Sequence, residues 1–508
     1  MGAFSRISSS LSRTAASVIA LRNPDRAARF LAFQNALGVP GLKLSYHASD
    51  RKDPGLMRWR PTNQTGDALI FKDAALARAR ARDMERNNDN VSGALRKISN
   101  NVVFRGIFPQ AQCKLLDGTP DRIRARIIEK DFRAWAKAVK WKSKQKQTIR
   151  RGWMDGGVFV RFFPAPTLQR HGLVPLGIEL LEVDHLDQNK NEVLAGGNII
   201  RKGIEYTPDG FEAAYWLFPE HPGNSGGLLG RALQSSLRVD AETCLFFTDP
   251  ERPSQSLPIP WMISIIRGLH NFDEYDNDER LASRLAAKFG IFIINKATTW
   301  PGGTGGAGND LEGNPFTGGG NGEIPGHIGA GSVHELPVGK EVVTASNPRP
   351  GNNHEPYARV SLRRASTGFG MSSASFSNDY TDATMSALRH AIQEERRGYR
   401  VQQDLLVDEL CDVVWPIWLR YRALFGLGDD RDVEATWALG GWDWIDPYKD
   451  AKAAEILIGK RVESRTTFAS QRGGDWEDTI VEIGQEEKMI AEHAPDPKEP
   501  AHGNNANG

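Results

Sequence analysis

The longest helical pattern in the sequence lies between Ala383 and Gly426, and it limits the possible folds more than any other segment. Apolar residues recur along it at steps of three, four or seven: Met385, Leu388, Ile392, Tyr399, Leu406, Leu410, Val413 and Ile417. This spacing predicts one amphipathic helix of about 65 Å at 1.5 Å per residue. Pro416 is expected to kink it. The apolar stripe is narrow, which suits a helix that packs against neighbours along one side.

The rest of the chain predicts an α+β fold. Helical spacing runs from Lys72 to Val102, as one helix or as two joined near Asn87 and Asn88, and again from Asp121 to about Arg151. The strand-like segments "GGVFVRFFPA" and "LGIELLEVDHLD" follow, and then a hairpin that turns at residues 208–210. Further helices are expected after Pro258 and from Pro356 to about Thr367.

The composition excludes several classes of protein. The 508 residues suit about three domains, and 40% hydrophobic with 25% charged residues allows a real core. A net charge of +1 argues against a protein that coats DNA. Three widely spaced cysteines, Cys113, Cys244 and Cys411, predict neither a disulfide framework nor a zinc knuckle. No apolar run approaches the roughly 18 residues that a membrane span needs. The Ser- and Arg-rich segment before Asp25 fits a transit peptide or a peripheral arm, and we favour the arm.

Two motifs suggest enzyme chemistry when they are considered alone. Gly303–Gly308 fits G-x-G-x-x-G, but the glycine- and proline-rich sequence after it cannot form the helix that would receive a phosphate. Residues 223–227 fit the G-x-S-x-G nucleophile motif around Ser225. The strand before Ser225 belongs to an antiparallel hairpin, and acid–base candidates such as His270 lie in charged helices. A turn is favoured, and a serine hydrolase using Ser225 is the alternative function.

Two charged segments contain residue types that bind ligands. "LEVDHLD" holds Glu182, Asp184, His185 and Asp187. On a strand the first two share one face and the last two the other, so we favour solvated charges at a strand end and predict no metal site. A basic run is the strongest local signal for nucleic acid, although a solvated helix face is favoured. It contains Trp141 among Lys137, Lys140, Lys142, Lys144, Lys146, Arg150 and Arg151.

The order of the segments resembles that of a known family. "ARARARDMERNNDNVSGALRKISNNVV" is followed by "RGWMDGGVFVRFF", "IELLEVDHLD" and "GIEYTPDGFEAAYWLF", and later by "ELPVGKEVVTASNPRPG" and "WDWIDPYKDAKA". Together with the long helical stretch after Pro258, these segments resemble the portal proteins of tailed phages, in the lambda-like portal family. The resemblance covers about residues 70 to 490. The N-terminal arm and the glycine-rich insertion depart from the family's pattern.

The resemblance implies a homo-oligomeric ring, commonly of twelve subunits, at one vertex of the capsid. Double-stranded DNA would pass through its channel during packaging and ejection. The implied partners are the terminase large subunit, a head-completion or adaptor protein, and the major capsid and scaffold proteins. Such proteins are not enzymes and need no cofactor, no metal and no membrane. They are expected in the virion, and in the host cytoplasm during assembly.

The resemblance also implies a division of the chain. An N-terminal arm (1–60) precedes a wing (61–258), a first stem helix (259–290), and a clip with the glycine-rich insertion (291–353). A second stem helix (354–368), a tunnel loop (369–382), a long kinked wing helix (383–429), a crown (430–490) and a disordered tail (491–508) follow. The expected DNA-channel residues are Phe376, Asn378 and Tyr380 in the tunnel loop, with Arg359, Arg363 and Arg364 on the helix before it.

Overall fold

The computed structural model describes residues 61–115, 117–224, 235–288, 292–295, 340–343, 354–381, 383–470, 472, 474 and 476–493. For residues 285–288, 292–295 and 340–343 only the backbone is described. The predicted arm, the whole glycine-rich insertion (302–331), the end of the tail and Ser225 lie outside these ranges. Contacts separate Met1–Thr65 from Gly66–Gly508, and the elements named here belong to the second unit. Its helices and antiparallel sheets confirm the mixed α+β class.

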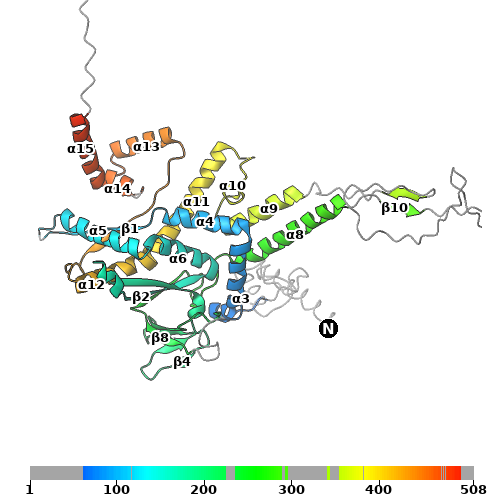
Figure 1. Ribbon diagram of the computed structural model, residues 1–508, viewed down its shortest axis with the longest axis horizontal. Helices are drawn as coiled ribbons and strands as arrows, with labels where there is room; N and C mark the ends of the chain where they lie inside the picture. The colour runs from blue at the N-terminus through cyan, green and yellow to red at the C-terminus, as the bar shows by residue number, and fades with distance from the viewer. Residues whose placement is uncertain are drawn as a thin grey trace, which may run out of the picture. The chain divides into compact units, whose positions relative to one another are not determined.

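Four helices form the first part of this unit (Figure 1). They are α3 (Gly66–Asn87), α4 (Asp89–Val103), α5 (Arg122–Ala138) and α6 (Trp141–Asp155). Of the two alternatives for residues 72–102, the structure shows two helices joined near Asn87 and Asn88. Asn88 is extended, and its side chain accepts a hydrogen bond from the N–H of Val91 to cap α4. Lys140, in the left-handed conformation at φ 56°, turns the chain between α5 and α6.

The strands form small antiparallel sheets. One has the order β3 (Leu176–Leu181), β2 (Gly157–Pro164) and β9 (Cys244–Thr248). A second runs in chain order through β4 (Glu192–Val193), β5 (Ile199–Arg201), β6 (Ile204–Tyr206), β7 (Glu212–Leu217) and β8 (Leu237–Asp240). The predicted hairpin is the β6–β7 connection, where Gly210 takes a positive φ of 90°. A separate ribbon pairs β1 (Phe108–Gln112) with β12 (Glu434–Ala438), so two segments far apart in the sequence lie side by side.

Aromatic side chains make the centre of the core. Phe132 and Trp135 of α5 pack with Trp141 of α6 and with Trp415 and Trp418, and the Phe132 ring lies 5.0 Å from Trp135 and 5.1 Å from Trp418. The buried indole N–H groups of Trp135 and Trp141 donate to backbone carbonyls, at 2.8 and 3.1 Å. The cluster therefore buries much apolar surface without leaving these two donors unsatisfied.

The predicted long helix is present, and it contains an irregular turn before Pro416. It consists of α11 (Met385–Leu406), a π-helical turn η3 (Val407–Cys411) and α12 (Asp412–Leu424). Pro416 lies inside α12. Proline cannot donate to the carbonyl four residues earlier and crowds it. That carbonyl belongs to Asp412, which directly follows the π turn. The hydrogen-bond ladder of the helix therefore widens one turn before the proline.

Two helices distant in sequence pack side by side. Figure 1 shows α8 (Ile263–Lys288) alongside α9 (His354–Gly368), and the rings of Tyr275 and Tyr357 join them at 4.4 Å. β10 (Phe292–Asn295) pairs antiparallel with β11 (Lys340–Val343) between these helices in the chain.

Three helices end the described chain: α13 (Pro447–Gly459), α14 (Arg465–Ser470) and α15 (Trp476–His493). Within the described ranges, no helix combines the length and apolar character needed to cross a membrane.

Candidate functional site

The segment between α9 and α11 holds three of the six predicted site residues. Its start is shaped by glycine: a Cβ on Gly368 would lie 2.1 Å from the side chain of Ile265 on α8, so only glycine lets the two helices approach this closely. Gly370 then turns the chain at φ 65°. A one-turn helix α10 (Ser373–Ser377) follows, and Ser372 caps it by accepting from the N–H of Ser375.

Contacts from two other helices fix the base of this loop. Glu395 of α11, which is 7% exposed, accepts hydrogen bonds from the N–H of Ser372 at 2.7 Å and from the hydroxyl of Ser375 at 3.1 Å. Lys97 of α4 donates to the carbonyl of Ser375 and to the side chain of Asn378. These charge-assisted bonds hold α10 against α4 and α11.

The tip of the loop, residues 378–381, is exposed. Asn378 takes a left-handed conformation at φ 57°, and Tyr380 is 51% exposed. The Asp379 carboxylate accepts from the N–H and the hydroxyl of Thr381, and these bonds hold the pKa of Asp379 below its ordinary value. Arg359 lies 3.8 Å from Asp379 and 3.1 Å from Glu355. The tip is thus a small polar turn whose only acid is already engaged.

One predicted site residue has a different setting. We expected the Phe376 ring to face DNA beside Asn378 and Tyr380, but it is 4% exposed and stacks 5.5 Å from Phe369 in the core. Burying the ring is favourable because it removes apolar surface from water. Arg363 and Arg364 are exposed on α9, and neither pairs with an acid in the described part of the chain. Whether any of these residues contacts DNA stays a prediction.

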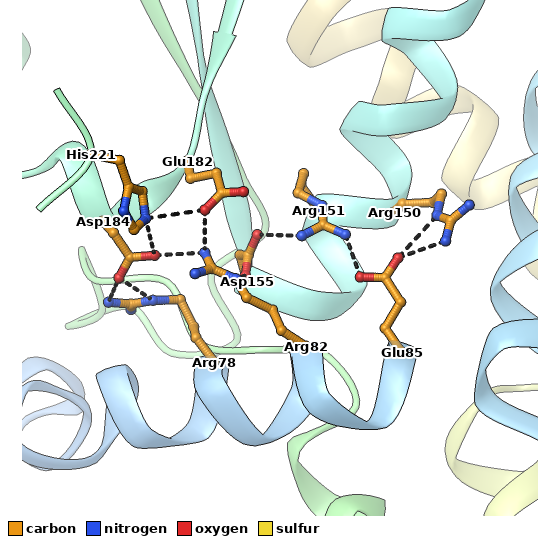
Figure 2. Close-up of polar contacts among 9 residues, drawn as sticks. All are labelled: Arg78, Arg82, Glu85, Arg150, Arg151, Asp155, Glu182, Asp184 and His221. Atoms are coloured by element: carbon orange, nitrogen blue, oxygen red, sulfur yellow. Dashed lines mark hydrogen bonds and ion pairs between the residues drawn. The ribbon is translucent and has the colours of Figure 1, made fainter. Parts of the chain in front are cut away.

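A second cluster of polar residues joins α3, α6 and the end of β3 (Figure 2). Its members are Arg78, Arg82, Glu85, Arg150, Arg151, Asp155, Glu182, Asp184 and His221. Arg82 lies at its centre, 2.7 Å from the buried Asp155 carboxylate and 2.6 Å from Asp184. The helical spacing of the alanine–arginine repeat places Arg78 beside it, 3.0 Å from Asp184.

Two expectations for this cluster were wrong. Residues 183–185 form a 3₁₀ turn rather than a strand, so Asp184 turns back toward α3. Asp184 is therefore 22% exposed and paired with arginines instead of solvated at a strand end. Sequence reasoning also missed His221, which lies 3.2 Å from Glu182 and 3.6 Å from Asp184. His221 is far from Glu182 and Asp184 in the sequence, so no local pattern linked it to them.

Glu182, Asp184 and His221 have the residue types of a metal site, but their hydrogen bonds oppose one. Their ligand atoms all lie within 4.8 Å of one another. However, His221 Nδ1 accepts from the N–H of Gly223 at 2.9 Å, so the proton of the neutral ring is on Nε2, the atom that faces the carboxylates. A metal-bound histidine shows the opposite pattern and donates its second N–H. Arginines already neutralise the two acids, so the cluster is a structural ion-pair network.

Burial and the neighbouring arginines shift the pKa values of this network's acids in opposite directions. Burial alone would raise the pKa of Asp184, but Arg78 and Arg82 lower it below its ordinary value. The pKa of Glu85 is lowered against burial by Arg151 and Arg150 in the same way. Asp155 differs, because burial outweighs Arg151 and Arg82 and raises its pKa.

Stability is therefore expected to fall in acid. Glu85 has a lowered pKa in the folded state, so it contributes stability above its unfolded pKa of about 4.3, and that stability is lost as pH falls through the lower folded value. Urea unfolding between about pH 6 and 3 should show this loss. Glu85→Gln should flatten the dependence. Identical pH slopes for the two proteins would contradict the assignment.

The predicted basic run is divided between two environments. Trp141 is 1% exposed in the aromatic core, and Arg150 and Arg151 both pair with Glu85, at 2.6 and 2.5 Å. Only the lysines of the run remain near solvent, so it is neither a uniform solvated face nor a continuous nucleic-acid stripe.

The site combines two features in the described residues. Paired charges join α3 and α6 to the end of β3, and the loop before α11 presents a small polar turn. Residues 52–403 match the family described as phage portal protein, lambda family, and the chain belongs to that family. Portal proteins are structural components of the virion rather than enzymes. The alternative function, a serine hydrolase using Ser225, is therefore wrong.

The chain is also similar to individual proteins. The chain is 28% identical over 466 residues to a probable portal protein of Halomonas phage phiHAP-1, covering 86% of this chain and 87% of that one. Among solved structures it is similar to a chain in the neck of a native gene transfer agent particle computed with C12 symmetry, with a TM-score of 0.40 and 12% identity over 81% of this chain and 94% of that chain. A chain in the neck of the empty particle, computed with C6 symmetry, also gives 0.40, with 13% identity over 82% and 96%.

Proposed function

We propose that this chain assembles into a ring of twelve copies at one capsid vertex, and that double-stranded DNA passes through the ring during packaging and ejection. The observation that carries the proposal is the family match over residues 52–403. A closed ring is also the expected form for a symmetric homo-oligomer with head-to-tail contacts. The ring would assemble in the host cytoplasm and remain in the virion.

We further propose the division of the chain described above. The wing would span 61–258, and 259–290 and 354–368 would be the stem helices. The clip would lie at 291–353, the tunnel loop at 369–382, the long wing helix at 383–429 and the crown at 430–490. The packed pair α8 and α9 supports a two-helix stem, and the unbroken helical path from α11 to α12 supports the long helix. The ring would dock the terminase large subunit and a head-completion or adaptor protein, and contact the major capsid and scaffold proteins.

In this proposal the tip at 378–381 lines the channel. It carries no base, and its single acid is engaged by Thr381 and Arg359, so it can slide along phosphates without holding them. Arg363 and Arg364 on α9 would supply the weak phosphate contacts, with Arg359 at the edge of the tip.

Ring formation is tested by negative-stain microscopy and native mass measurement of the purified chain. A closed ring is expected. Monomers or dimers alone, over a range of salt concentrations, would overturn the proposal.

The channel role is tested at the tip. Tyr380→Ala changes an exposed side chain, so rings should form normally while packaged DNA yield or retention falls. Tyr448→Ala, at an exposed tyrosine of α13, is the matched control and should package normally. Unchanged DNA yield and genome length in the tip variant would show that the loop does not line the channel.

A further inference from the structure

A positively charged groove lies where α5 meets α6. Its volume is about 620 Å³, and Phe108 and Trp141 contribute to its apolar floor. Five cationic side chains surround that floor: Arg133, Lys137, Lys140, Lys142 and Lys146.

The described residues supply no acid to this groove. Lys146 donates to the side chain of Asn100 at 2.6 Å, and none of the five cations forms an ion pair within the described ranges. Elsewhere Arg78 and Arg82 of α3 and Arg151 at the C-terminal end of α6 are paired with acids. Burial, and then the charge of Lys142, lower the pKa of Lys146, which indicates like-charge repulsion inside the groove. An acidic partner would relieve that repulsion.

The groove is rigid enough to be a preformed binding surface. Trp141 below it is fixed in the aromatic core by its bond to the carbonyl of Ile107. Lys140 is held at the corner by its left-handed backbone, between two helices that pack on the same core. Binding would therefore order little of the chain beyond the side chains of the cations.

Helix α15 has the complementary chemistry. Ile480, Ile483 and Ile490 are 49%, 43% and 60% exposed, and no described residue of α15 is buried. At 100° per residue these isoleucines share one face of the helix. Glu487 lies among them, and Glu482 and Glu486 lie along the edge of that face. A face that combines isoleucines with acids matches an apolar floor with a cationic rim.

We propose that α15 of a second copy of this chain docks in the groove between α5 and α6. The isoleucines would cover the floor, and Glu482 and Glu486 would face the cations. The inference rests on the proposed function, since it needs assembled copies. A second copy is favoured because the first turn of α15 is tied to the opposite end of α5 in its own chain, by Arg122–Glu477 at 2.8 Å and Arg126–Asp478 at 3.1 Å.

Cysteine cross-linking tests the contact directly. The three native cysteines are buried, so introduced cysteines report the new contact. Lys140→Cys chains mixed with Glu486→Cys chains during assembly should yield a covalent dimer under oxidation. Lys140→Cys mixed with Glu455→Cys, at an exposed acid of α13, is the matched control and should not. When both Lys140→Cys and Glu486→Cys are in one chain, covalent multimers support the inference, and only internally cross-linked monomers overturn it.

Charge exchange provides a second measurement. Lys137→Glu/Lys140→Glu, or Glu482→Lys/Glu486→Lys, should each weaken self-association at least about tenfold, and all four changes together should restore it. Rings that form normally with either reversal and give no cross-link would overturn the inference while leaving the proposed function intact. A wild-type chain that never assembles would overturn both.

Discussion

Arg82→Ala is expected to destabilise the folded chain by about 3–5 kcal/mol, because it removes one partner from a buried ion-pair network. Asp155 is fully buried and would lose the guanidinium 2.7 Å from its carboxylate. Asp184 would keep Arg78 but lose its 2.6 Å contact with Arg82. The loss should appear as a lower urea midpoint with an unchanged m-value.

The control is an arginine in an exposed pair on another helix. Arg397 is 74% exposed and pairs with Glu394 at 2.9 Å, so Arg397→Ala should change the midpoint little. Asp155→Asn should be milder than Arg82→Ala, since burial already raises the pKa of Asp155 and favours an uncharged group there. Equal midpoints for Arg82→Ala and Arg397→Ala would show that the network does not hold α3 to the sheet.

Features set by neighbouring residues were predictable from the sequence. The spacing of apolar residues gave the long helix, and Asn88, a residue that favours helix caps, gave the break between α3 and α4. The β6–β7 turn followed from its Pro-Asp-Gly sequence, because Gly210 supplies the positive φ that the turn needs. In each case the determining interaction lies within a few residues.

Features set by distant residues were not predictable in this way. Arg82 meets Asp155, Asp184 and Glu182 only after three elements have packed, so the pattern "LEVDHLD" by itself indicated solvated charges. The closest local signal was the i, i+4 pair Arg78 and Arg82 in a helix with alanines on its buried side.

The burial of Phe376 has the same origin. A serine-rich segment that follows two glycines predicts an exposed loop, and "MSSASFSNDYTD" contains no hint that a carboxylate from α11 will fix it. Glu395 is nearly buried and accepts from the loop backbone, which turns the first half of the loop into α10 and directs the Phe376 ring inward. The sequence predicted a single loop over 369–382 and did not separate its exposed tip from this anchored base.

Glu395→Ala should release the loop and leave the rest of the chain folded. The change leaves the N–H of Ser372 and the hydroxyl of Ser375 without their acceptor, at a cost of about 3 kcal/mol to the local structure. Hydrogen exchange at residues 371–381 should then accelerate about 100-fold, while amides of α5 keep their protection. Glu395→Gln retains one acceptor oxygen, so its exchange rates in the loop should lie between those of Glu395→Ala and those of the wild type.

Glu394→Ala is the matched control, because Glu394 lies next to Glu395 on α11 but is 66% exposed and, among the described residues, pairs only with Arg397. It should leave exchange in the loop unchanged. If the loop lines the channel as proposed, Glu395→Ala rings should also package less DNA, since a released tip no longer holds a fixed position along the DNA path. Wild-type exchange rates in the Glu395→Ala loop would mean that Lys97 and the Phe376 ring hold it unaided, and that Glu395 has no positioning role.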